Sequence, residues 1–180
     1  GILDAQCWAR DPEEIGKRHK RHETPIEQKE SMKWLRSYHK VAEIQKLCPD
    51  TMLISIGDRE SDVYELFVEA TKDKNAPGLL VRSEKTRNRK TGEELLWDMM
   101  PQTEVAGSLL LHIPRNNSQK ARDAKVDVHF SEIKLNPPKR QSQLPSVKIW
   151  AVYVKENEPD ETVKSPIEWM LLTTVPVNNF

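Results

Sequence analysis

Cysteine is scarce in this chain of 180 residues, which contains only Cys7 and Cys48. The two lie far apart and form no Cys-x-x-Cys pair, and the five histidines show no zinc-ligand spacing with them. These patterns give no support to a structural zinc site. Two unpatterned cysteines favour a reducing compartment.

Long apolar runs are also missing. No stretch approaches the roughly 20 apolar residues that cross a bilayer, and the N-terminus lacks the apolar core of a signal peptide. We therefore expect no membrane partner and a cytoplasmic location. The chain begins with Gly rather than Met, and we expect it to be an excerpt of a longer protein. With 37% hydrophobic and 31% charged residues, it has the composition of a globular domain.

The chain has no excess of charge of either sign, because 28 Lys and Arg residues balance 28 Asp and Glu residues. Domains that bind nucleic acid on their own are usually basic, so zero net charge counts against DNA binding as a property of the whole chain. The basic residues are nevertheless clustered, and one such cluster alone would be an ordinary solvated loop. Four clusters between apolar segments favour a phosphate-facing side: Lys17–Arg21, Lys85–Lys90, Arg115–Lys125 and Lys139–Arg140.

The pattern in the first half of the chain predicts a strand at 2–9 and then a helix. Thr24 is expected to cap this helix, with Pro25 in its first turn and Glu27 completing a capping box. Cys48-Pro49 is expected to end it. Its apolar face is predicted to contain Met32, Leu35, Val41, Ile44 and Leu47.

Residues 51–83 predict a βαβ unit with two parallel strands. The nearly continuous apolar run at 52–56 is typical of a strand buried on both faces. Ser61 or Asp62 is expected to cap the following helix, and the second strand, at 79–81, ends at Arg82. The helix is predicted to bury Val63, Leu66, Phe67 and Ala70.

The second half of the chain predicts antiparallel strands at 108–113, 126–135, 147–154 and 168–174. Apolar alternation changes phase within 126–135, which predicts a bulge or bend near Ser131. The fold class expected is α/β: a βαβ core with a flanking helix, interrupted by an antiparallel β-rich insert.

Asp58 is the main candidate for chemistry. It follows a parallel strand at its C-terminal end, where open α/β sheets place their ligands. A carboxylate there, beside a flexible glycine, can hold a hard divalent cation. Spacing alone leaves open whether Asp58 is a turn residue or a metal ligand. Glu60 and Asp62 are interpreted as residues that favour the start of the next helix.

Four blocks of the sequence resemble the insertion-sequence-four family of bacterial transposases. They are EQKESMKW (27–34), GDRESDVYELF (57–67), LLVRSEKTR (79–87) and SPIEWMLLTTVPV (165–177). The blocks stand in family order at comparable spacing and cover most of the chain. The resemblance implies a partial RNase H-like catalytic core at 1–103, a β-rich insert at 104–165 and a return strand into the core at 166–180.

The resemblance also implies a reaction and its partners. Members of the family use three carboxylates to hold two Mg²⁺ or Mn²⁺ ions, and they nick, hairpin and transfer transposon ends into target DNA. It implies a homodimer in the full-length synaptic complex and a location at the bacterial nucleoid. The first catalytic Asp would lie upstream of Gly1, and the final Glu, in a helix after Phe180. We therefore expect residues 1–180 alone to be inactive.

Within the matched blocks, the resemblance assigns roles to individual residues. Asp58 matches the second metal-binding Asp, and Arg82 and Arg87 match arginines that contact transposon-end DNA. Trp169 matches a tryptophan that stacks on a flipped base, although a strand tryptophan is otherwise more often part of a core. Glu84 departs from the family, which has a basic residue there.

Two alternatives remain open at this point. The first is a non-catalytic DNA-binding or scaffold module derived from a transposase, which would keep the fold. The second is a small phosphohydrolase built on the βαβ unit, which would need more carboxylates at strand ends than this sequence has.

Overall fold

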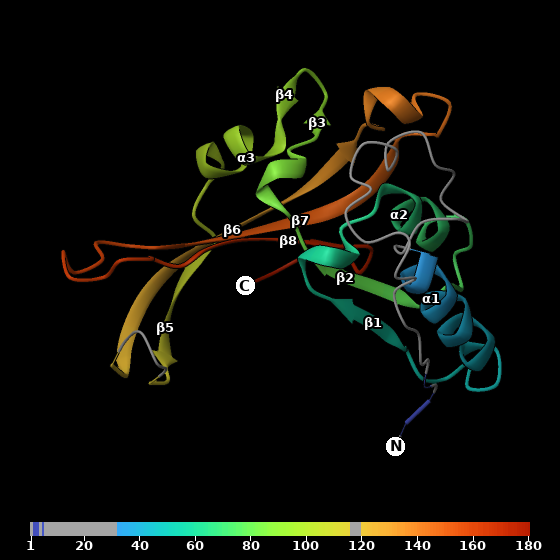
Figure 1. Cartoon of the computed structure of the whole chain (residues 1–180), viewed down its shortest axis with the longest axis horizontal. Coiled ribbons are helices and arrows are strands. Elements are labelled where there is room, and N and C mark those ends of the chain that lie inside the picture. The colour runs from blue at the N-terminus through green and yellow to red at the C-terminus, as the bar shows by residue number, and fades with distance from the viewer. Residues whose placement is uncertain (1, 4, 6–31, 116–119) are drawn as a thin grey trace, which may run out of the picture.

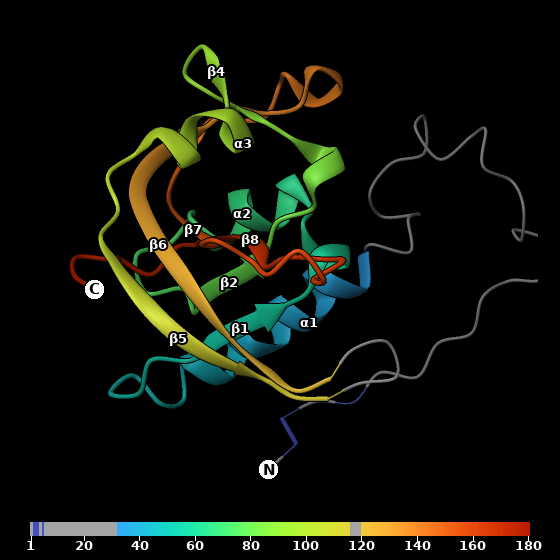
Figure 2. The same cartoon turned by 90° about the vertical axis from the view of Figure 1, so that its left-hand side faces the viewer.

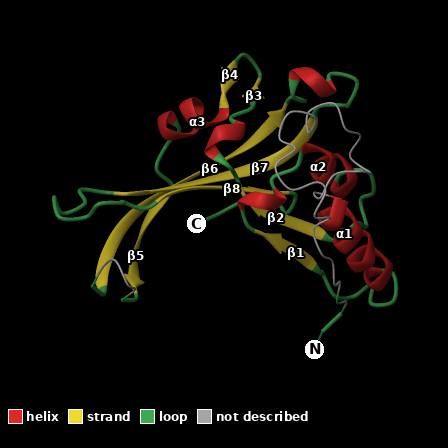
Figure 3. Cartoon of the chain, in the orientation of Figure 1, coloured by secondary structure: helices red, strands yellow, loops and turns green. Residues whose placement is uncertain are grey.

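The structure is a computed structural model that describes residues 2–3, 5, 32–115 and 120–180. Figure 1 shows its elements along the chain, and Figure 3 separates helices from strands. The α-helices of this part of the chain are α1 (Met32–Gln45), α2 (Tyr64–Ala70) and α3 (Leu96–Met99). The strands are β1 (Ile54–Gly57), β2 (Gly78–Arg82), β3 (Lys90–Thr91), β4 (Glu94–Leu95), β5 (Gly107–Ile113), β6 (Arg122–Leu135), β7 (Val147–Glu156) and β8 (Glu168–Thr173). Short 3-10 helices η4 (Arg59–Ser61), η5 (Lys85–Arg87), η6 (Met100–Gln102) and η7 (Lys139–Gln141) occupy the connections.

All eight of these strands belong to one sheet, in the order β1-β2-β8-β7-β6-β3-β4, with β5 paired to β6. Strands β1 and β2 are parallel and are joined through α2, which confirms the predicted βαβ unit. The other pairs are antiparallel, and β8 lies between β2 and β7. The sheet thus continues across residues 104 and 166, where the sequence predicted domain boundaries, and that division stays a prediction.

The main core lies between the sheet and helices α1 and α2, which Figure 2 shows together behind β1 and β2. Alternate residues of β2 and β8 point into it, including Leu79, Val81 and Leu172. Two buried tyrosines satisfy their hydroxyls on backbone carbonyls: Tyr38 donates to Pro77 at 2.7 Å and Tyr64 to Pro145 at 2.8 Å. Burial raises the pKa of Tyr38 to about 12, so its hydroxyl stays a donor.

A second, smaller core on the opposite face of the sheet explains the phase change in β6. It contains Ala124, Val126, Val128, Val154 and Ile167. The later residues Ile133 and Leu135 face the main core instead. Of the predicted bulge or bend near Ser131, the bulge is wrong, because β6 pairs with β7 in unbroken register from Val126 to Leu135. The bend stays a prediction. A continuous strand whose two halves contribute to cores on opposite faces shows the same change of phase.

Strand β1 is not buried on both faces, contrary to the sequence prediction. Within the described chain it forms the edge of the sheet, and Ile54 and Ile56 are 42% and 73% exposed. The helices α1 and α2 cover only the other face of the sheet at this point. The apolar run therefore predicted the strand correctly, but the prediction that both faces of the strand are buried is wrong.

Of the predictions about the first helix, the burial of Leu47 is wrong, and the capping box is not tested. Leu47 is exposed, because α1 ends at Gln45 and Leu47 lies in the turn that follows. The buried positions of α1 are Leu35, Tyr38 and Gln45. The expected capping box at 24–27 lies outside the described residues, as does most of the expected strand at 2–9. No helix in the described part of the chain has the length and apolarity to cross a membrane.

Truncation of a buried leucine of β8 tests the main core. Leu172 is fully buried, whereas Leu110 of β5 is 72% exposed. We expect Leu172→Ala to lower the free energy of unfolding by about 2–5 kcal/mol, because it removes apolar contacts and leaves a cavity. The matched variant Leu110→Ala should change it by no more than about 0.5 kcal/mol. Urea denaturation followed by circular dichroism measures both, and equal losses would contradict this assignment of the core.

Candidate functional site

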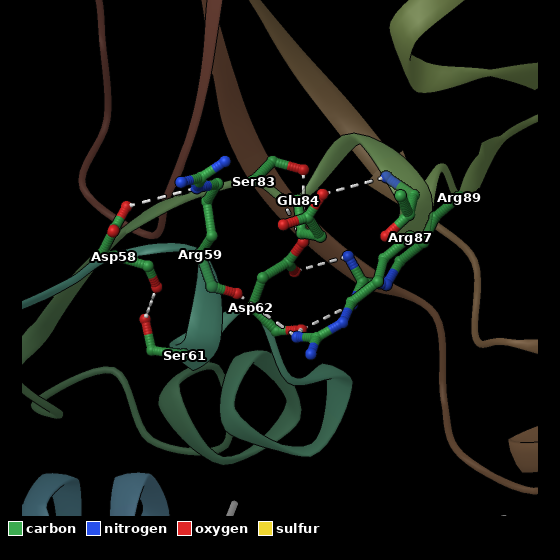
Figure 4. A network of polar contacts seen from close by, with 9 residues as sticks. Asp58, Arg59, Ser61, Asp62, Ser83, Glu84, Arg87 and Arg89 are labelled. Carbon is green, nitrogen blue, oxygen red and sulfur yellow. Dashed lines mark hydrogen bonds and ion pairs between the residues drawn. The ribbon is translucent and has the colours of Figure 1, made fainter. Parts of the chain in front are cut away.

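A tight turn after β1 presents the carboxylate of Asp58. The hydroxyl of Ser61 donates to the Asp58 carbonyl at 2.6 Å, and the Ser61 amide donates to the same oxygen at 2.8 Å. A Cβ at Gly57 would lie 2.1 Å from Ser61 Oγ, so this position requires glycine for space. The turn leaves the Asp58 side chain 67% exposed at the end of the strand. Figure 4 shows the hydrogen bond from Ser61 to Asp58 that closes this turn.

Arg82 stands beside Asp58, because it ends the neighbouring parallel strand β2. Its Nη1 lies 3.7 Å from Asp58 Oδ1, and Arg59 Nε lies 4.0 Å from the same oxygen. Both distances exceed that of a hydrogen bond, and exposed pairs of this kind contribute little to stability. The carboxylate is thus accompanied by positive charge and still open to other ligands.

Trp169 extends this arrangement onto β8. The Arg82 guanidinium lies 5.2 Å from the centre of the Trp169 ring, in cation–π geometry. Arg82 pairs with Leu171, two residues after Trp169, so both side chains stand on the same face of the sheet. The indole is 36% exposed. Asp58, Arg82 and Trp169 form a row across β1, β2 and β8, which we call the Asp58–Arg82–Trp169 row.

A second polar group lies at Glu168, on the opposite face of β8 from Trp169, because successive side chains of a strand alternate between faces. Its carboxylate accepts from Lys85 Nζ at 2.7 Å and from the buried hydroxyl of Tyr153 at 2.9 Å. The hydrogen bond from Lys85, followed by that from Tyr153, lowers the pKa of Glu168. Burial and the same carboxylate raise the pKa of Tyr153. Sequence analysis missed this group, because nothing in the spacing of residues 85, 153 and 168 indicates that they meet.

Asp62 corrects the sequence interpretation of a helix cap. The residue at the start of α2 is Val63, and no side chain caps the helix there. Asp62 is fully buried, and its Oδ1 lies 2.5 Å from Nη1 of the buried Arg89. Asp62 therefore pairs with a residue 27 positions along the chain instead of capping α2.

Arg87 is not part of the Asp58–Arg82–Trp169 row. Its Nη1 donates to the carbonyl oxygens of Asp62 and, at 3.4 Å, Arg59, so the guanidinium lies against the turn after β1. Its expected contact with DNA stays a prediction. Glu84 stands where the family that the sequence resembles has a basic residue. Its carboxylate accepts a hydrogen bond from the Thr86 amide at the start of η5.

The donor type of Asp58 fits a hard divalent cation, but the described residues do not complete a metal site. No group of three or more His, Cys, Asp and Glu side chains that could hold an ion occurs among them. The nearby Glu60 forms an ion pair with Lys33 at 3.3 Å, and Asp62 is committed to Arg89. Among the three acids of the turn, Asp58 differs in that its ion pairs, at 3.7 and 4.0 Å, are longer than a hydrogen bond.

Comparison of the chain with known protein families gives no match, and comparison with curated proteins gives none either. The assignment of the site therefore rests on its geometry and on the sequence blocks.

The pKa of Glu168 tests its contacts with Lys85 and Tyr153 on the face of β8 opposite Trp169. Because Lys85 is the main cause of its lowered pKa, Lys85→Met should raise that pKa toward the ordinary glutamate value. The control Lys148→Met removes a lysine that pairs with Glu132 and should leave the pKa unchanged. Carbon-13 NMR titration of the Glu168 carboxyl measures the shift. An unchanged pKa in Lys85→Met would show that the pair does not form in solution.

Proposed function

We propose that this chain is a catalytic-core segment of a cut-and-paste DNA transposase of the DDE type. The observation that carries the proposal is the Asp58–Arg82–Trp169 row, in which an acid, an arginine and an exposed indole meet at one end of a parallel strand pair. Three of the four residues that the family resemblance assigned to the site lie in this row.

In this proposal, Asp58 is one ligand of a pair of Mg²⁺ or Mn²⁺ ions. Its carboxylate is exposed, stands on backbone that is hydrogen-bonded within the turn, and has only loose ion pairs to give up. Further carboxylates from outside the described residues would complete the site. The ions supply activation of a water or 3′-hydroxyl nucleophile and stabilisation of the leaving oxygen.

Arg82 and Trp169 would hold the DNA at this carboxylate. A guanidinium matches phosphate oxygens with two parallel donors, and it tolerates the neighbouring indole because it stacks on aromatic faces. Trp169 offers an accessible ring on which an unpaired base can stack. The DNA would be a transposon end or its target, and the complete protein would act as a homodimer on nucleoid DNA in the bacterial cytoplasm.

A second candidate is a non-catalytic DNA-binding or scaffold module with the same fold. The observation in its favour is that no group of three or more His, Cys, Asp and Glu side chains that could hold an ion occurs among the described residues. Both candidates require Arg82 and Trp169 to contact DNA, and they differ in whether Asp58 is needed for strand cleavage.

Replacement of Asp58 separates these two candidates. In the complete protein that contains this chain, Asp58→Asn should abolish Mg²⁺-dependent nicking of a labelled DNA end, because the amide is a poor metal ligand. Binding of the same DNA should change little, since the side chain offers no contact to phosphate. Glu60→Gln, which alters a neighbouring acid already paired with Lys33, is the control and should retain nicking. Nicking by Asp58→Asn at the wild-type rate would exclude the catalytic role of Asp58 on which the first candidate depends.

Replacement of Trp169 tests base stacking with residues 1–180 alone. Trp169→Ala should weaken binding to a DNA end with an unpaired base by about 1–3 kcal/mol, roughly 5- to 150-fold. Trp169→Phe should retain most of that affinity. Trp150 packs against Phe130 at a ring distance of 6.3 Å and stands on β7 four residues from Val154, the strand partner of Trp169, so Trp150→Ala is the control. Fluorescence anisotropy measures each affinity, and equal losses for both alanine variants would indicate a packing role.

A further inference from the structure

Asp62 and Arg89 form the most deeply buried ion pair among the described residues, with side chains 0% and 7% exposed. Burial of two charges costs free energy that their attraction offsets only when the remaining polar atoms are satisfied. Here the Asp62 carboxylate meets this condition, because it accepts from Arg89, from the Glu84 amide at 2.8 Å and from the Ser83 hydroxyl at 3.3 Å, whereas Arg89 Nε is buried without a partner. Figure 4 shows these contacts around Asp62.

The pair joins the two turns that present the Asp58–Arg82–Trp169 row. Asp62 belongs to the turn after β1, four residues beyond Asp58. Its carboxylate is bonded to Ser83 and Glu84, which directly follow Arg82 at the end of β2. In the other direction, Arg89 Nη2 donates to the Asp62 carbonyl at 3.1 Å. Side-chain and backbone atoms of Asp62 are thus both tied to the segment after β2.

The row needs such a support, because its own contacts are weak. The ion pair between Asp58 and Arg82 is exposed and spans 3.7 Å, so it cannot fix either side chain. A packed apolar pair in place of Asp62 and Arg89 would fill the same space, but it would leave the Glu84 amide without its acceptor. Hydrogen bonds give the directional link that apolar contacts lack.

We propose that Asp62 and Arg89 are positioning residues that hold the metal-binding carboxylate and the phosphate-binding arginine at a fixed separation. This inference rests on the proposed function for its consequence, although the link between the two turns is a property of the fold itself. A misplacement of about 1 Å at a reacting centre can cost about 100-fold in rate. The pair therefore influences cleavage without touching DNA or metal.

The test uses the double variant Asp62→Asn with Arg89→Gln, which removes both charges and keeps amides able to hydrogen-bond. The matched control is Glu156→Gln with Arg122→Gln. It removes a second ion pair, with side chains 3% and 19% exposed, between β6 and β7. Amide hydrogen exchange on residues 1–180 gives the first measurement. We expect exchange to quicken about tenfold or more at both 58–62 and 83–87 in the test variant, and at neither segment in the control.

Cleavage by the complete protein gives the second measurement. The test variant should nick DNA at least about tenfold more slowly, with a kcat effect that persists at temperatures where circular dichroism shows it folded. The control should nick at the wild-type rate. If the test variant does not fold, Arg89→Lys replaces it. Lysine keeps the buried charge, but it has one nitrogen in place of the two with which Arg89 contacts the Asp62 carboxylate and carbonyl.

Each outcome bears on a separate claim. Quicker exchange at only one of the two turns would refute the link between them. Quicker exchange at both turns with unchanged nicking would refute the positioning role and leave the pair purely structural. Absence of Mg²⁺-dependent nicking in the wild type would refute the proposed function, and the exchange result would then still decide whether the pair joins the turns.

Discussion

The position of β2 between β1 and β8 is the constraint on which the candidate site depends. Backbone hydrogen bonds hold β1 parallel to β2 and β8 antiparallel to it. Parallel pairing brings the ends of β1 and β2 together, and with them Asp58 and Arg82. Antiparallel pairing brings the start of β8 to the same edge. Trp169 therefore lies near Arg82 although the two are far apart in the sequence. Three distant segments meet there because of strand direction.

Much of the fold could be predicted from the sequence, because local signals determine its elements. The apolar run before Gly57, the helix face at Leu66 and Phe67, and the alternation in β6 each indicated the right type of element. The environment of each element depends on distant partners and was harder to predict. Among the described residues, the run at 52–56 leads into the edge strand β1, and the phase change in β6 reflects two cores rather than a bulge.

For the candidate site too, the sequence predicted the main residues but not the contacts that support them. Asp58, Arg82 and Trp169 lie in recognisable blocks and do meet, whereas Arg87 turns toward the backbone of the η4 turn. The supporting contacts could not be found by spacing. Asp62 and Arg89 are 27 residues apart, and Tyr153 and Glu168 are 15 apart on neighbouring strands. Such pairs become visible only when the sheet brings their segments together.

The two aspartates that frame η4 show how one short motif can present the same side chain in opposite environments. Asp58 stands before the 3-10 helix on a turn that excludes any side chain at Gly57, and it is left exposed with loose ion pairs. Asp62 follows the helix, is fully buried and accepts three hydrogen bonds. A buried carboxylate with every oxygen engaged has nothing to offer a metal, whereas an exposed one cannot by itself hold a fixed position. The division between them lets one acid remain available for binding while the other orders the turn that carries it.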